Sequence, residues 1–500
     1  MSRASWWRAA SLILVTGLAA RGLWVAWQYY FSGGPRYRVE SAMIALAIVG
    51  AILVALRRND QTAADSPQTS LSLAWLPLFM LAAGVLYSRA IGLGFLSDDF
   101  TLRAMAQSGL GAGTGWFFRP VPLLLWRALL AVDDSAVLLH LVNIVLHGIN
   151  AFLVGRLGIA MGMRREVAVG AAALFLTFPA LPESVAWTAG IQDVLMTTMA
   201  LAVVVLSARE TPDVRRIALV CGLLILGFGS KETAVCIPVL IALCWMTPER
   251  MRRDVTLFGA LALVTVAYLA IRLPMGIASD YLGAPTRYFF KQMIVMAFGT
   301  LATPWRVPMS PADRWVSFVA VGVMVLMLVH AYLTWRRSEP RVQRDIRLTL
   351  WVLASIAPVF TLFFIGPTLE GSRYLYLGSC AWSLLMADLL ASMSERVTTQ
   401  PVMFGGAVAA IVLVFVVSVQ REIGMWERAA TLRDHVLAEA RTAKGTCLEA
   451  TFASVPDSVE GAYVFRNGFR EALGAGAAAS DSVSPECRFT WTGGSFAPSR

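Results

Sequence analysis

The stretch LSLAWLPLFMLAAGVLYSRAIGLGFLSDDF (residues 71–100) decides the fold class. Its first part is apolar and about as long as the roughly 20 residues that a helix needs to cross a bilayer. Two adjacent carboxylates, Asp98 and Asp99, follow this apolar run directly. Because an ionisable group in or beside a membrane is costly to bury, such a group commonly marks a functional site. The stretch therefore predicts a membrane helix that ends at a polar site.

The whole chain has the composition of a membrane protein. Of its 500 residues, 57% are hydrophobic and 15% are charged, whereas an ordinary soluble domain has about 25% charged residues. The sequence predicts an all-α polytopic membrane protein with about thirteen transmembrane helices, and a re-entrant or interfacial segment at 288–303. The expected spans are residues 9–30, 40–56, 71–91, 135–157, 167–179, 185–208, 217–229, 234–246, 256–273, 315–335, 348–366, 375–393 and 402–419.

The positive charges indicate the orientation of these helices. The formal net charge is +10, but the arginines lie in short clusters in alternate connections, as the positive-inside rule predicts for cytoplasmic loops. We therefore expect a cytoplasmic N-terminus, a periplasmic C-terminus and no nucleic-acid partner. The first hydrophobic stretch is expected to remain as a helix and not to be a signal peptide. Residues 95–100, 181–187, 229–234, 274–285 and 370–377 then share the outer face.

The chain changes character after about residue 421. A charged amphipathic helix is expected first, followed by a glycine-, serine- and alanine-rich segment with short strand-like runs. The sequence thus predicts N-terminal transmembrane helices at 1–93, a transmembrane core with catalytic outer loops at 94–420, and a small extracytoplasmic domain at 421–500. Cys447 and Cys487 are the only cysteines in that last region, and they could form a disulfide in an oxidising periplasm.

The two aspartate pairs allow a structural interpretation beside a functional one. Ser97 could cap a helix that begins with Asp98 and Asp99, because carboxylates in a first turn interact favourably with the helix dipole. Asp133 and Asp134 precede a long apolar stretch and fit that structural role better.

A polar stripe runs along the following helix. His140, Asn143, His147 and Asn150 are spaced so that they share one helix face. His140 and His147 lie about 10 Å apart along the axis, which is too far to bind one metal ion directly. We therefore predict no metal site here and favour hydrogen bonds between helices, with the wall of a polar cavity as the alternative.

The expected outer loops hold the remaining unusual polarity. They offer carboxylates, cations suited to phosphate, and aromatic rings suited to a sugar or a lipid. This set consists of Glu183, Trp187, Gln192, Asp193, Lys231, Glu232, Thr233, Glu370, Arg373, Tyr374 and Tyr376. Gathered on one side of the membrane, these residue types predict a site for a lipid-linked phosphosugar.

The order of six short motifs resembles the C-type polyprenol-phosphate-sugar glycosyltransferases, in particular a bacterial branch similar to the membrane part of tetratricopeptide-repeat O-mannosyltransferases. The motifs are SDDF (97–100), FRPV (118–121), HLVNIVLHGINAFLV (140–154), FPALPESVAWTAGIQDVL (178–195), SKETAVCIP (230–238) and SRYLYLGS (372–379). The resemblance implies transfer of a sugar from a polyprenyl-phosphate donor to an acceptor hydroxyl at the outer face of a bacterial inner membrane, with inversion at the anomeric carbon.

The resemblance also implies residue roles. Asp98 is expected to be the base that takes the acceptor proton, with Asp99 orienting the acceptor or serving as the alternate base. Arg373, Lys231 and Arg119 are expected to bind the departing phosphate. The expected substrate-binding residues are Tyr374, Tyr376, Glu183, Trp187, Asp193, Glu232 and His147. No cofactor is expected with certainty, although a divalent cation could take part.

Two other functional classes remain open. A secondary transporter or flippase would also have about a dozen spans, although it typically shows an internal repeat and ionisable groups near the middle of the membrane. A scaffold or assembly subunit would explain the tail but not the charged outer loops. Within the enzyme class, the alternative is a ligase or polymerase that acts on lipid-linked oligosaccharides. The sequence identifies neither the sugar nor the acceptor, which could be a glycan, a lipid or a protein.

Overall fold

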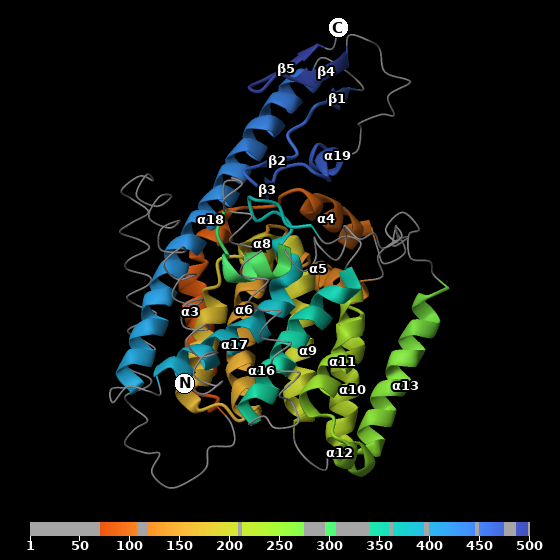
Figure 1. The fold of residues 1–500 in the computed structure, drawn as a ribbon. Helices are drawn as coiled ribbons and strands as arrows, with labels where there is room; N and C mark the ends of the chain where they lie inside the picture. Colours follow the sequence, from red (N-terminus) through yellow and green to blue (C-terminus); the bar gives the residue numbers. More distant parts are fainter. Residues whose placement is uncertain are drawn as a thin grey trace.

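The computed structural model describes residues 71–108, 119–208, 213–274, 296–306, 340–359, 364–394, 400–445, 450–474 and 487–498. These residues are mostly helical (Figure 1). Five helical segments are long and apolar enough to cross a membrane, namely Val137–Ala160, Thr188–Ser207, Val255–Arg272, Ser372–Ala391 and Met403–Lys444. The spans expected at 9–30, 40–56 and 315–335 lie outside the described residues, as does the first half of 288–303.

The centre of the bundle is α6 (Val137–Ala160), which packs against α3 (Trp75–Leu86), α7 (Arg165–Leu176) and α9 (Ile191–Ser207). Small residues allow these helices to approach closely. A Cβ atom added at Gly148 of α6 would lie 2.6 Å from the Cα atom of Met80 in α3. On the other side of α7, α17 (Tyr376–Ser394) packs against α16 (Pro340–Ile356).

A second group of helices lies beside α9. It comprises α10 (Val214–Phe228), η3 (Glu232–Cys236), α11 (Ile237–Trp245), α12 (Pro248–Arg253) and α13 (Val255–Arg272). Figure 1 shows α13 at the edge of the bundle, and its buried residues are Leu257, Leu261 and Arg272. An apolar helix with so little protein cover is suited to contact with lipid.

The longest helix, α18 (Gln400–Lys444), has 45 residues and is therefore about 68 Å long at 1.5 Å per residue. This exceeds twice the hydrocarbon thickness of a bilayer, which is about 30 Å. The sequence predicts a span at 402–419 and then a separate amphipathic helix, but the structure joins them into one rod. The C-terminal part of this rod projects beyond the bundle (Figure 1).

The residues after α18 form short strands. β1 (Thr451–Ala453) pairs in parallel with β4 (Arg488–Trp491), which pairs antiparallel with β5 (Phe496–Pro498). β2 (Ser458–Val459) and β3 (Ala462–Tyr463) form an antiparallel hairpin, and α19 (Phe469–Ala472) follows it. Cys487 is disulfide-bonded, whereas Cys447, its expected partner, lies outside the described residues.

Short elements connect the helices at the end of the bundle opposite to the arginine-rich α12. They include α4 (Asp98–Ser108), α8 (Pro182–Ala186) and the β2–β3 hairpin (Figure 1). The remaining short elements are η1 (Ser88–Gly92), α5 (Pro120–Leu130), η2 (Thr188–Gly190), η6 (Ala357–Val359) and η7 (Ser372–Leu375). The SDDF motif and the arginines of α12 thus lie at opposite ends of the bundle.

Candidate functional site

The loop before α4 places Asp98 and Asp99 in different environments. Asp99 is fully buried, and its two carboxylate oxygens accept hydrogen bonds from the backbone N–H groups of Leu96 and Ala189, each at 2.8 Å. Asp98 is half-buried, and its Oδ1 accepts a hydrogen bond from Asn467 at 2.6 Å. Among the described residues, its Oδ2 has no hydrogen-bond partner. Asp98 is therefore the carboxylate that is placed to meet a substrate.

Burial has a clear electrostatic consequence for Asp99. Burial raises the pKa of Asp99 to about 8, although its hydrogen bonds act in the opposite direction. Since both oxygens are engaged with the backbone, Asp99 ties the loop to η2 and is not placed to act as the alternate base. Its carboxyl group holds the chain next to Asp98 in place.

Asp99 should make the stability of the protein depend on pH. A carboxyl group whose folded-state pKa is raised from 3.8 to about 8 binds a proton more tightly in the folded state, so its contribution weakens as the pH rises from about 4 to about 8. We expect the melting temperature of the wild type to fall more steeply across this range than that of Asp99→Asn. Thermal unfolding in lipid nanodiscs from pH 5 to pH 9 measures the difference. Parallel curves for the two proteins would contradict the assignment.

The loop that carries Asp98 is held in place by α18. Arg433 of α18 donates hydrogen bonds from Nη1 to the carbonyl oxygens of Leu93 and Phe95, at 2.6 and 2.7 Å. Ser97 adopts a φ of 49°, a left-handed conformation that is uncommon outside glycine. The backbone is therefore fixed immediately before Asp98.

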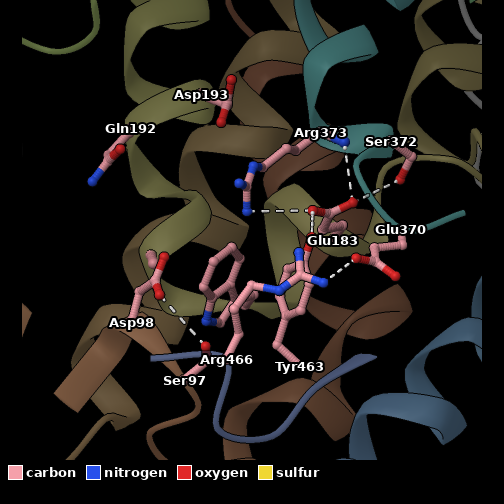
Figure 2. Close-up of polar contacts among 12 residues, drawn as sticks. Ser97, Asp98, Glu183, Gln192, Asp193, Glu370, Ser372, Arg373, Tyr463 and Arg466 are labelled. Atoms are coloured by element: carbon pink, nitrogen blue, oxygen red, sulfur yellow. Dashed lines mark hydrogen bonds and ion pairs between the residues drawn. The ribbon is translucent and has the colours of Figure 1, made fainter. Parts of the chain in front are cut away.

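Glu183 and Arg373 form the centre of the second part of the site (Figure 2). Glu183 is 4% exposed, and its carboxylate lies 3.4 Å from Nη1 of Arg373. The carboxylate also accepts hydrogen bonds from the Ser372 hydroxyl, the Arg373 backbone N–H and the Tyr463 hydroxyl, at 3.1 to 3.3 Å. Burial raises the pKa of Glu183, while Arg373 opposes this change.

Aromatic rings surround the Arg373 guanidinium. Its central carbon lies 5.0 Å from the ring centroid of Trp187, 5.3 Å from that of Tyr374 and 5.7 Å from that of Tyr463. Rings at these distances stabilise a cation through their quadrupoles. The Arg373 side chain remains 22% exposed, so its charge can reach an anion arriving from outside the cluster.

The other two predicted phosphate-binding cations already have protein partners. Lys231 forms an ion pair with Asp193, and the side chains are 6% and 8% exposed. Arg119 binds Glu232 at 2.8 Å and also donates to the side chain of Gln192. The Lys231 ammonium lies 5.5 Å from the ring centroid of Tyr374, which places this pair next to Arg373.

The structure does not bring His147 and Tyr376 to an exposed part of the site. Both are fully buried, and His147 Nδ1 lies 2.7 Å from the Tyr376 hydroxyl while Nε2 lies 3.0 Å from the carbonyl oxygen of Leu176. Tyr376 also accepts a hydrogen bond from Asn150. Their polar atoms hold helices together, so we remove both from the set of substrate-binding residues.

The expected hydrogen bonds between helices are present for two members of the stripe on α6, His147 and Asn150, whereas His140 and Asn143 contact carbonyl oxygens of loops. His140 contacts the carbonyl oxygen of Gly94, Asn143 donates to that of Trp187 and Asn150 to that of Val194. The other aspartate pair also has a structural role. Asp133 accepts hydrogen bonds from Ser135, and Asp134 forms an ion pair with Arg103.

Three residues of the C-terminal tail belong to the same cluster and are missing from the sequence-based set. Tyr463 binds Glu183, Asn467 binds Asp98, and Arg466 forms ion pairs with Glu370 and Asp457. The central carbon of Arg466 also lies 4.5 Å from the ring centroid of Tyr463. No local pattern marks their contacts with Glu183, Asp98 and Glu370, because these three partners lie far away in the sequence.

The cluster offers a carboxylate, a cation and a small adjoining pocket. The pocket has an empty volume of about 250 Å³, and Glu183, Ser372, Arg306 and Glu422 are among its lining residues. Among the described residues, no group of three or more histidine, cysteine, aspartate or glutamate side chains is arranged to hold a metal ion.

The amino-acid sequence matches no family model, and no curated protein sequence is significantly similar to it.

Proposed function

We propose that the protein is an integral membrane glycosyltransferase that moves a sugar from a polyprenyl-phosphate donor to an acceptor hydroxyl. The proposal includes the thirteen-span topology, with the N-terminus in the cytoplasm and the site on the periplasmic face of a bacterial inner membrane. One observation supports it most. A half-buried carboxylate, Asp98, and a partly exposed guanidinium, Arg373, lie at the same end of the bundle (Figure 2).

Trp187 connects these two groups. Its indole N–H donates to the carbonyl oxygen of Leu96 at 3.1 Å, two positions before Asp98, and its ring lies under Arg373. The tail gives a second connection. Tyr463 contacts Glu183, which is the ion-pair partner of Arg373, and Asn467 contacts Asp98. Residues 463 and 467 are four positions apart, so their Cα atoms are separated by at most about 14 Å. This short tail segment therefore contacts both Asp98 and the Glu183 partner of Arg373.

In the proposed reaction, Asp98 Oδ2 accepts the proton of the acceptor hydroxyl as the hydroxyl oxygen attacks the anomeric carbon. The bond between that carbon and the phosphate oxygen breaks, and its electron pair leaves with the polyprenyl phosphate. Arg373 stabilises the negative charge that develops on the phosphate. The products are the glycosylated acceptor, free polyprenyl phosphate and a protonated Asp98. Attack opposite the leaving group inverts the anomeric centre.

The first test measures the release of free polyprenyl phosphate. Purified protein in lipid receives a panel of polyprenyl-phosphate sugars and a lysate that contains acceptors. We expect release by the wild type and a loss of about 10²–10⁴-fold in Asp98→Asn, which is the range for removal of a general base. Asp134→Asn is the matched control, because Asp134 is a carboxylate in an exposed ion pair with Arg103 and such pairs contribute little.

The outcomes separate this proposal from its main rival. If neither the wild type nor the control releases polyprenyl phosphate from any donor, the transferase proposal fails. If the protein instead moves the intact donor across the bilayer, and Asp98→Asn does so equally well, the function is that of a flippase.

A further inference from the structure

The segment of the tail from residue 461 to residue 468 contacts the site at both ends. At one end, the Tyr463 hydroxyl donates to Glu183 at 3.1 Å. At the other end, the Asn467 amide donates to Asp98 at 2.6 Å. The intervening Val464 accepts a hydrogen bond at its carbonyl oxygen from the backbone N–H of Ser97, at 3.0 Å. The tail is thus in direct contact with the loop that carries the proposed base.

Gly468 shows how close this approach is. A Cβ atom added at Gly468 would lie 2.4 Å from the carbonyl oxygen of Ser97 and 3.0 Å from Cβ of Phe100. Gly468 also has a φ of 80°, a conformation that only glycine adopts readily. The backbone N–H of Asn467 in addition donates to the Ser97 hydroxyl at 3.3 Å. Backbone geometry therefore delivers the Asn467 side chain to Asp98.

We propose that Asn467 is a positioning residue for the base and that the tail segment 461–468 is an integral part of the site. This inference rests on the proposed function. The Asn467 amide occupies Oδ1 of Asp98, which fixes the rotation of the carboxylate and leaves Oδ2 to meet the acceptor hydroxyl. The reaction is faster when the base is already held in its reactive orientation, because less freedom of motion must be lost on reaching the transition state.

A purely structural role for Asn467 would give a different pattern. Asn467 is exposed and Asp98 is half-buried, so their hydrogen bond contributes little to the stability of the fold. Loss of the bond should therefore lower kcat and leave thermal unfolding unchanged.

The experiment compares Asn467→Ala and Asn467→Asp with the wild type in the polyprenyl-phosphate release assay. We expect kcat to fall about tenfold in Asn467→Ala and further in Asn467→Asp, with an unchanged KM for the donor. The fall should be larger in Asn467→Asp, because a carboxylate cannot donate a hydrogen bond to Asp98 and repels it. Arg470→Ala is the control, since Arg470 is an exposed residue of the same tail.

Each outcome decides a different question. A wild-type kcat in both Asn467 variants, with an active wild type and an inactive Asp98→Asn, would overturn the role of Asn467 and leave the transferase intact. The absence of release from every donor in the wild type itself would overturn the transferase and the inference together.

Gly468→Ala tests the docking of the tail separately from the chemistry. The added methyl group must displace the tail from Ser97, so we expect faster cleavage of the tail by a protease in intact membranes and lower activity. Cleavage at the wild-type rate together with wild-type activity would show that the contact is dispensable, and the inference would fail.

Discussion

Arg373→Met should destabilise the protein by about 3–5 kcal/mol, the range for removing one partner of a buried ion pair. The cost arises because Glu183, which is 4% exposed, keeps its carboxylate but loses the cation 3.4 Å away. The loss should shrink at low pH, since a proton can then neutralise Glu183. Thermal and chaotrope unfolding in lipid at pH 5 and pH 8 measure both effects.

The double variant Arg373→Met/Glu183→Gln separates the structural role of Arg373 from its proposed role in catalysis. With neither charge of this pair left, we expect stability to return to near the wild-type value. We expect donor release to stay low, because the double variant still lacks the cation for the departing phosphate. Recovery of both stability and release would show that Arg373 only neutralises Glu183.

A matched control distinguishes this pair from an ordinary surface contact. Arg466 forms an ion pair with Glu370, and its side chain is 41% exposed. Arg466→Met should change stability by no more than about 1 kcal/mol, because exposed ion pairs contribute little. An equal loss in Arg373→Met would contradict the view that Glu183 depends on its cation.

The features that the sequence predicts correctly are those with a local signal. The polar stripe on α6 follows from spacings of three and four residues, and its hydrogen bonds to neighbouring helices and loops are present. The five apolar helices follow from length and composition. Even the gathering of Glu183 and Arg373 is predicted in outline, because both lie in loops that the arginine pattern assigns to one side.

The features that the sequence does not predict depend on distant contacts. Asn467 meets Asp98 across 369 positions, and the hydropathy pattern assigns the two residues to separate regions. The domain boundary predicted at residue 421 also falls inside α18. The hydropathy changes there, but the helix continues. The sequence suggests His147 as a site residue. Only the packed structure shows that Tyr376 and Leu176 contact both of its ring nitrogens.

The different environments of two adjacent residues are equally hard to predict from the sequence. Asp98 and Asp99 differ by one position, yet one is half-buried and the other is fully buried. Successive residues on a helix point in directions about 100° apart, so the first turn of α4 directs one carboxylate toward the tail and the other toward η2. The sequence identifies the pair, and the packing of η2 and the tail assigns the roles.

Lys231→Met should also destabilise the protein by about 3–5 kcal/mol, for the same reason as Arg373→Met. Lys231 and Asp193 form an ion pair in which neither side chain is more than 8% exposed, so Lys231→Met leaves a buried carboxylate without its cation. The double variant Lys231→Met/Asp193→Leu should regain stability, because apolar residues of similar volume often replace a buried ion pair without loss. Unfolding in lipid measures each step.

The activity of Lys231→Met/Asp193→Leu is expected to differ from that of Arg373→Met/Glu183→Gln. The Lys231 ammonium is bound by Asp193 and its side chain is 6% exposed, whereas the Arg373 side chain is 22% exposed. We therefore expect Lys231→Met/Asp193→Leu to release polyprenyl phosphate at close to the wild-type rate, which would make Arg373 the principal phosphate-binding cation. A stable double variant without release would instead return Lys231 to the phosphate-binding role that the motif resemblance implies.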